Sequence, residues 1–236
     1  MDVARDLAQQ GAPEGTIVVA DEQTAGRGRG GHVWYSPPEQ SLYLSVVLRP
    51  TLTARHASWI TMIAALAARD VIAEVIPSAT ARIKWFNDVL LNGRKVGGIL
   101  VESSITGDQF DYAVLGVGLN VNTTFDSAPL DVQASATSLL NECKGAQACA
   151  TMPLNRAEIL TRVLTSFRAR YDNLLQQRGN PATEYARHLD TLGRDVGINA
   201  GNEVIAGRAL RIADDGALVV LTVHGERRVS FGEINL

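Results

Sequence analysis

The order of apolar and polar positions along the chain predicts alternating helices and strands. Alanine and larger apolar residues recur at helical spacing over 54–76 and stop before Pro77, which predicts one long core helix. A second helix is expected at 154–177, and a first one is expected to end at Gly11. Shorter apolar runs predict strands at 42–48, 82–85 and 110–121, and a short buried strand at 16–20.

A hairpin and a change of pattern organise the rest of the chain. Asn92-Gly93 separates two apolar runs, at 89–91 and 95–102, and this dipeptide suits the positive backbone angles of a tight hairpin turn. The polar segment 123–150 is expected to be a loop with one short helix near 135–141. From about Gly193, short alternating runs separated by turn residues predict a small antiparallel barrel. We therefore expect a larger domain at 1–190 and a barrel at 191–236.

Composition narrows the class of protein. The chain has 236 residues, of which 46% are hydrophobic, so it can bury a substantial core. Its net charge of -3 provides no general attraction for nucleic acid or anionic lipid, so neither DNA nor a membrane is an expected partner. No apolar run is long enough to span a membrane and no signal peptide is visible, which predicts a cytoplasmic protein. Cys143 and Cys149 fit no metal or redox spacing and are expected to be incidental.

The glycine-rich segment Gly26-Arg27-Gly28-Arg29-Gly30-Gly31 satisfies the pattern G-x-G-x-x-G after a predicted strand. A dinucleotide-binding loop must open directly into a helix, whereas Pro37-Pro38 follows closely here, so that interpretation fails. The segment is instead a loop that presents two guanidinium groups, with glycines that let the backbone approach a ligand. A simple solvated loop remains an alternative, and nucleic-acid contact is disfavoured because no basic stripe surrounds it.

A second polar cluster, Lys84-Trp85-Phe86-Asn87-Asp88, follows a predicted strand, and Lys95 enters an apolar strand beside Gly97-Gly98. An ordinary turn remains the alternative interpretation of the Lys84–Asp88 cluster, and a snorkelling surface lysine remains the alternative for Lys95. A cation on an apolar strand rarely points inward without a partner, which favours a site. The four histidines have no zinc-ligand spacing, and no G-x-S-x-G elbow is present.

Three segments in this order and spacing resemble the catalytic domain of biotin protein ligases: DEQTAGRGRGGHVWYSP, KWFNDVLLNGRKVGGILVE and GVGLNVN. The close resemblance covers residues 17–122. It implies an α/β fold of the α+β type, with a mixed sheet, helices on one side and a relationship to lipoate ligases. The region from Gly193 is similar to the family's SH3-like C-terminal barrel, with less motif support.

The resemblance assigns roles to individual residues. Gln23 would bond the biotin head group, and Gly26, Arg27, Gly28 and Arg29 would form the loop that closes over biotin and the adenylate. Lys95 would contact the biotin carboxylate and the α-phosphate, and Gly98 would let the ligand lie against the strand. The nucleotide-binding residues implied are Trp34, Trp85, Asn87, Asp88 and Asn120, with Asp88 also as a ligand of Mg²⁺. Lys95, Arg27 and Arg29 would be the catalytic residues.

The implied reaction uses ATP to activate biotin as biotinyl-5'-AMP. Biotin is then transferred to a lysine of a biotin carboxyl carrier protein of acetyl-CoA carboxylase or a related enzyme. Both the biotin carboxylate and the α-phosphate are negative, so cations such as Lys95 and the loop arginines suit the chemistry. The protein is expected to be a monomer or a homodimer.

The chain also departs from the family's pattern. The family has a first strand and Ser-Thr-Asn before the helix that begins here near Val3, and this sequence begins after them. Two explanations stay open: translation starts further upstream, or one wall of the biotin pocket is missing. Phe86 stands where proline is usual and is expected to be tolerated as an apolar residue. The absence of a winged-helix segment implies no repressor function. Two alternatives stay open: a lipoate ligase or transferase, and a noncatalytic biotin-binding module.

Overall fold

The structure, a computed structural model, describes residues 1–146, 153–176, 178–201 and 203–235. Its helices are α1 (Asp2–Gln9), α2 (Ala57–Val75), α3 (Leu130–Ser135), α4 (Leu139–Ala146), α5 (Arg156–Leu175) and α6 (Pro181–His188). Its strands are β1 (Ile17–Ala20), β2 (Leu42–Leu48), β3 (Ala81–Lys84), β4 (Asp88–Leu91), β5 (Arg94–Thr106), β6 (Gln109–Leu119), β7 (Asp195–Ala200), β8 (Glu203–Ile212), β9 (Leu218–Thr222), β10 (Gly225–Val229) and β11 (Glu233–Asn235). Single 3-10 turns lie at Arg29–Gly31 and Ala54–His56.

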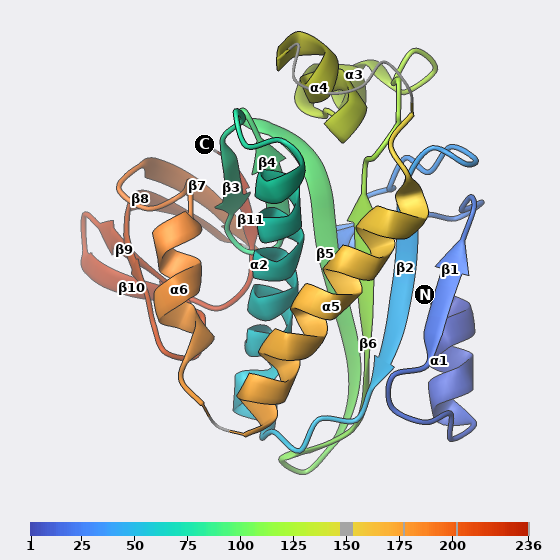
Figure 1. The fold of residues 1–236 in the computed structure, drawn as a ribbon. Helices are drawn as coiled ribbons and strands as arrows, with labels where there is room; N and C mark the ends of the chain where they lie inside the picture. Colours follow the sequence, from blue (N-terminus) through green and yellow to red (C-terminus); the bar gives the residue numbers. More distant parts are fainter. Residues whose placement is uncertain (147–152, 177, 202, 236) are drawn as a thin grey trace.

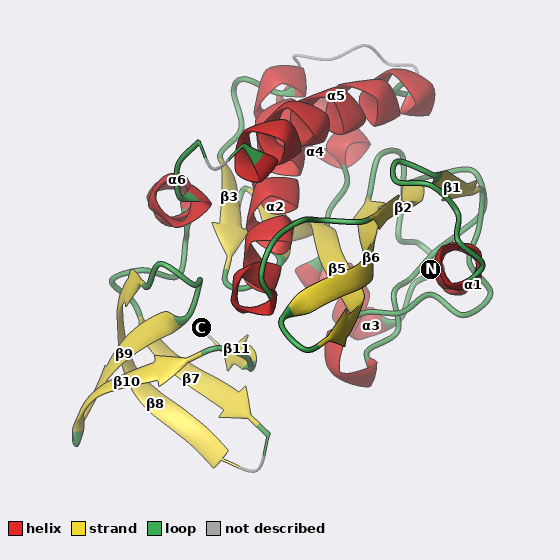
Figure 2. Ribbon diagram, turned by 90° about the horizontal axis from the view of Figure 1, so that it is seen from below, coloured by secondary structure: helices red, strands yellow, loops and turns green. Residues whose placement is uncertain are grey.

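The first sheet has the strand order β1-β2-β6-β5-β4-β3, and its neighbouring strands are all antiparallel. Side chains alternate between its two faces. Val46 and Leu115 face the large core under α2 and α5, whereas Val47 and Val114 pack against α1 on the other face. Figures 1 and 2 show α2 and α5 on one side of the strands and α1 on the opposite side.

The hairpin between β4 and β5 has the predicted turn. Asn92 and Gly93 have φ values of 49° and 81°, the left-handed conformation that this dipeptide tolerates. β5 continues from the turn and pairs with β6, which brings Gly98 opposite Gly118. The hairpin therefore carries Lys95 and Gly98 to the open face of the sheet.

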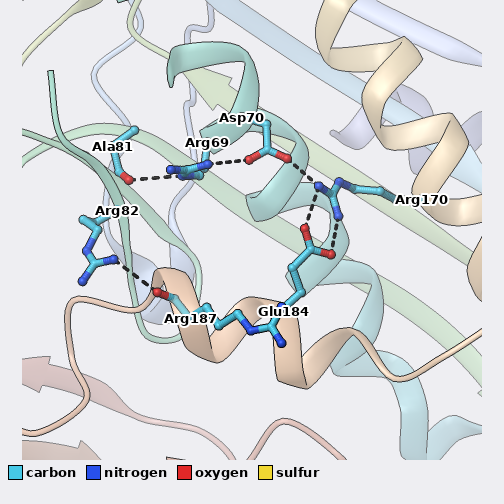
Figure 3. Close-up of polar contacts among 7 residues, drawn as sticks. All are labelled: Arg69, Asp70, Ala81, Arg82, Arg170, Glu184 and Arg187. Carbon is cyan, nitrogen blue, oxygen red and sulfur yellow. Dashed lines mark hydrogen bonds and ion pairs between the residues drawn. The ribbon is translucent and has the colours of Figure 1, made fainter. Parts of the chain in front are cut away.

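The helix layer is tied together by an ion-pair network (Figure 3). Arg170 on α5 pairs with Asp70 on α2 and, at 2.8 Å, with Glu184 on α6. Arg69 completes the chain, because its Nη1 lies 2.8 Å from Asp70 and its Nε donates to the carbonyl oxygen of Ala81 on β3. This network fixes α6 against the two long helices.

The second sheet has the order β10-β9-β8-β7-β11 and is also antiparallel. Its β8–β9 turn packs against the first domain: Ser58 Oγ donates to the carbonyl of Asp215 at 2.5 Å, and Trp59 Nε1 donates to that of Asp214 at 2.7 Å. Both bonds come from the start of α2, so the two parts share an interface.

The α/β class and the main elements are confirmed, but several details were wrong. The first sheet is antiparallel rather than mixed, because hairpins and short loops connect most of its neighbouring strands. The second sheet is not a closed barrel, since its edge strands β10 and β11 do not pair within the described residues. Helices do not lie on one side only, because α1 covers part of the other face.

Other local predictions also need correction. β1 is an edge strand rather than a buried one, with Val19 50% exposed. The single short helix expected near 135–141 is replaced by α3 and α4, which flank the extended residue Ala136. The sequence pattern also missed α6, a short helix that begins at Pro181 after the cap residue Asn180.

Two further findings concern the cysteines and the question of membrane-spanning helices. Cys143 is buried and disulfide-bonded, so the expectation that it is incidental was wrong, whereas Cys149 lies outside the described residues. Over the described residues, none of the helices is long and apolar enough to cross a membrane.

Candidate active site

A cavity of about 700 Å³ opens on the face of the first sheet that α1 partly covers. Its wall combines the glycine–arginine loop, the ends of β3 to β6, α3 and the β11 region of the second sheet. Every site residue implied by the sequence resemblance lines this cavity except Gly26. Segments from both ends of the chain, from Met1 to Ile234, therefore meet in one place.

Two glycines form the floor of the cavity beneath Trp34. A Cβ atom added to Gly118 would lie 2.7 Å from the indole ring, and one added to Gly98 would lie 3.1 Å from it. The indole Nε1 is buried and has no hydrogen-bond partner among the described residues. The floor therefore accepts a flat ring because both positions lack a side chain.

Lys95 lies at the edge of this floor and is partly buried. Its Nζ is 2.7 Å from Asp88 Oδ1 and 5.3 Å from the centre of the Trp34 ring. The structure therefore gives Lys95 the partner that the sequence argument required, while 36% of its side chain stays exposed.

The two loop arginines point to different parts of the molecule. Arg27 is exposed and lies 2.8 Å from Asp2 on α1 and 3.4 Å from Glu102 on β5. Arg29 is partly buried: its guanidinium lies 5.3 Å from the centre of the Phe86 ring and donates to the carbonyl of Gly232, the residue just before β11. Burial lowers the pKa of Arg29 from its ordinary value.

Hydrogen bonds inside the loop explain its glycines. Gly28 N–H donates to the carbonyl of His32 at 2.7 Å, closing a tight turn. A Cβ atom on Gly26 would lie 2.3 Å from the carbonyl oxygen of Trp34, so this buried glycine allows the loop to fold on itself rather than lining the cavity. The Gln23 side chain accepts a bond from Ser36 Oγ at 2.9 Å.

The remaining predicted residues line the cavity but bond to the backbone. Trp85 is 2% exposed, and its Nε1 donates to the carbonyl of Gly216 at 3.2 Å. Asn87 Nδ2 donates to the carbonyl of Ile99 at 2.7 Å. Asn120 Nδ2 likewise donates to that of Thr137, at 3.0 Å. The polar groups of these side chains thus hold the strand ends in place around the cavity.

Comparison with known proteins places the chain in a family. Residues 2–120 match the model of the biotin/lipoate A/B protein ligase family. The bifunctional ligase/repressor BirA of Bacillus spizizenii is 33% identical over 234 residues, which cover 99% of this chain and 70% of that protein. The chain belongs to this family. Residues 191–236 match a second model, that of the biotin protein ligase C-terminal domain.

Other members of the biotin/lipoate ligase family agree with this placement. The biotin--[acetyl-CoA-carboxylase] ligase of Mycobacterium tuberculosis is 36% identical over 212 residues, covering 87% of this chain and 73% of that protein. Among solved structures, the biotin protein ligase of Aquifex aeolicus in complex with biotin and ATP has a TM-score of 0.80 and 25% identity. The match covers 98% of this chain and 93% of that one.

Some cavity residues of this family member were not anticipated. The start of β11 contributes Glu233, and the residue before it contributes Gly232. Glu233 lies 3.1 Å from His32 Nε2. Phe86, assigned no role beyond being apolar, supports Arg29. Asp131 on α3 also lines the cavity. No local pattern marks Asp131, Gly232 or Glu233, because only the docking of distant segments brings them to the cavity. Phe86, in contrast, lies within the Lys84–Asp88 cluster that the sequence singled out.

Proposed function

We propose that the chain is an ATP-dependent biotin protein ligase. The proposal rests chiefly on the similarity to biotin ligases over nearly the whole chain, among them a structure that contains biotin and ATP. The cavity supports it, since Lys95, Arg27 and Arg29 surround a glycine floor. Gln23, Gly98 and Trp34 would contact biotin or the nucleotide, and Asn87, Asp88, Asn120 and Trp85 would frame the nucleotide side.

The residues suit both steps of the reaction. An oxygen of the biotin carboxylate attacks the α-phosphorus of ATP, and diphosphate leaves. Lys95 offsets the repulsion between the two negative groups and stabilises charge on the phosphoryl oxygens. An amine of the carrier protein's lysine then attacks the acyl carbon of biotinyl-5'-AMP, and AMP leaves. Closure of the loop that carries Arg27 and Arg29 keeps water from this mixed anhydride.

The donor set fits Mg²⁺ that arrives with ATP. Among the described residues there is no group of three acidic, histidine or cysteine side chains that could hold a metal. Asp88 provides one carboxylate beside Lys95. Mg²⁺ commonly takes one or two carboxylates together with substrate phosphates, so Asp88 would hold it with ATP. The ion would neutralise phosphate charge.

The domain division follows from the same proposal. Residues 1–190 would form the catalytic domain and 191–236 the C-terminal domain, which supplies one side of the cavity. The acceptor would be a biotin carboxyl carrier protein, the compartment the cytoplasm, and the active form a monomer or homodimer without DNA as a partner.

The test is biotin-dependent diphosphate release in the presence of ATP and Mg²⁺, with lipoate as the control substrate. We expect release with biotin and little with lipoate, followed by biotin transfer to a carrier domain. Biotin binding without diphosphate release would instead indicate a noncatalytic biotin-binding module. Preferential release with lipoate would indicate a lipoate ligase.

A further inference from the structure

Arg29 rests on an aromatic surface that the proposed function does not assign. Its guanidinium carbon lies 5.3 Å from the centre of the Phe86 ring, and its Nη2 donates to the carbonyl of Gly232. A guanidinium above an aromatic face is attracted by the negative charge of the ring's π system. Phe86 therefore does more than fill apolar space in the middle of the Lys84–Asp88 segment.

Tyr185 on α6 restrains Phe86 through a hydrogen bond to its backbone. Its side chain is fully buried, and its hydroxyl donates to the carbonyl oxygen of Phe86 at 2.6 Å. Removal of the hydroxyl would leave that carbonyl without this donor, and an unsatisfied partly buried carbonyl is costly. Asn87 and Asp88 follow directly in the chain, so this hydrogen bond restrains the segment that leads into the cavity.

The helix that carries Tyr185 is itself anchored. Its neighbour Glu184 pairs with Arg170 on α5 at 2.8 Å, and Arg170 also pairs with Asp70 on α2 (Figure 3). At the start of α6, the side chain of Asn180 accepts a hydrogen bond from Ala182 N at 2.9 Å and caps the helix. Tyr185 therefore projects from a helix fixed to both long helices.

Phe86 is also fixed from the side by Trp85. The two rings lie edge to face, 5.7 Å apart at 66°. Trp85 is buried and anchored by two hydrogen bonds: its backbone N–H donates to Thr191 Oγ1 at 2.9 Å, and its indole donates to the carbonyl of Gly216. The Phe86 ring thus has a defined orientation toward the cavity.

We propose that Phe86 and Tyr185 are positioning residues for Arg29 and form a platform on which the glycine–arginine loop docks. The role in retaining the adenylate rests on the proposed function, whereas the docking of the loop does not. Phe86 supplies the surface that Arg29 contacts. Tyr185 keeps that surface in place from the helix layer.

The docking is tested by hydrogen exchange of the loop amides at 26–34 in the full chain. Phe86→Leu keeps an apolar side chain without the ring, and Tyr185→Phe removes only the hydroxyl. We expect both to speed exchange by about threefold to tenfold, because each removes an attraction that holds the loop closed. Tyr171→Phe is the matched control: Tyr171 is a buried tyrosine on α5 that stacks on Phe167 and does not line the cavity.

A second measurement separates positioning from general stability. Phe86→Leu and Tyr185→Phe should release biotinyl-adenylate faster than the parent in the absence of acceptor. Combined with Arg29→Gly, neither should add to the release caused by that change alone, because both act through Arg29. Unchanged loop exchange in both single variants, or fully additive release in the double variants, would refute the platform. If the parent shows no biotin-dependent diphosphate release but the two variants still exchange their loop amides faster than the parent, the platform is supported and only the ligase function is rejected.

Discussion

At the scale of single residues, the cavity holds its cations by local pairing. Lys95 lies against Asp88 and above the Trp34 ring, and Arg29 lies against Phe86 and a carbonyl group. A partly buried cation needs such partners, because removal from water disfavours its charge. Both cations line the same cavity.

Lys95→Ala tests the first of these cations. A charge-assisted hydrogen bond contributes about 1.5–3 kcal/mol, so the rate of adenylation should fall at least about tenfold. Single-turnover formation of the adenylate measures this. Lys144→Ala, at an exposed position on α4, is the control and should behave as the parent. An unchanged rate in the Lys95 variant would remove this residue from the mechanism.

Arg29→Gly tests the closing of the loop. It removes the guanidinium that contacts Phe86 and Gly232, so the loop should open more often and release free adenylate. Rapid separation of free from protein-bound labelled adenylate measures the release. Arg55→Gly alters an arginine in the turn before α2 that does not line the cavity, and is the control. If the Arg29 variant retains its intermediate as the parent does, this role is excluded.

At the scale of elements, Glu142 on α4 secures the hairpin that carries Lys95. Its carboxylate accepts bonds from Thr137 Oγ1 at 2.6 Å, Asn92 Nδ2 at 2.7 Å and Arg94 Nη2 at 2.6 Å. Thr137 N–H in turn donates to the carbonyl of Lys95 at 2.8 Å. Burial alone would raise the pKa of Glu142, but these hydrogen bonds outweigh it and hold the pKa below its ordinary value of 4.5.

A pH prediction follows from this lowered pKa. The stabilising contribution of Glu142 is fully present above its unfolded pKa and is lost as the pH falls through its lower folded pKa. The free energy of unfolding should therefore fall less steeply below about pH 4.5 in Glu142→Gln than in the parent. Urea unfolding between about pH 5 and 3 measures the slope. Glu74→Gln, at an exposed position on α2, is the control, and equal slopes in Glu142→Gln and the parent would contradict the prediction.

At the scale of the whole molecule, the second sheet holds the first domain at the β8–β9 turn. Gly216 has φ 88°, and an added Cβ would lie 2.1 Å from the end of the buried Met62 and 2.9 Å from Ser58 Oγ. The carbonyl of Gly216 also accepts the Trp85 indole bond. A side chain at this position would collide with Met62 and Ser58, so the absence of a side chain at Gly216 allows the close contact between the β8–β9 turn and α2.

The variant Gly216→Ala tests how much this close contact contributes to the free energy of unfolding. Gly225→Ala is a matched control: Gly225 has a similar backbone conformation, φ 104°, but no described atom lies within 4 Å of its added Cβ. Overpacking costs roughly 1–3 kcal/mol, so the free energy of unfolding should be lower by about that amount for Gly216→Ala than for Gly225→Ala. Urea unfolding of both variants gives the difference. If Gly216→Ala and Gly225→Ala are destabilised equally, the contact between the β8–β9 turn and α2 accommodates the added methyl group at no energetic cost.

The sequence by itself determined those turns, helices and strands that depend on residues close together in the chain. The Asn92-Gly93 turn, the long helix before Pro77 and the strands around Lys95 follow from backbone preferences and apolar spacing, which act over a few residues. The ordered motifs also pointed to the glycine–arginine loop and Lys95, because those residue types suit an anionic ligand. Local spacing missed α6, whose eight residues are too few for a clear helical period.

Only the tertiary structure decided which groups those motifs contact. The pairing of Lys95 with Asp88, the placement of Arg29 between Phe86 and Gly232, and the support of Phe86 by Tyr185 all join residues through packing. Such contacts depend on how sheets and helices dock, and no periodicity in the chain encodes them. The open second sheet and the exposed edge strand β1 have the same origin, because burial and sheet closure are properties of the assembled layers.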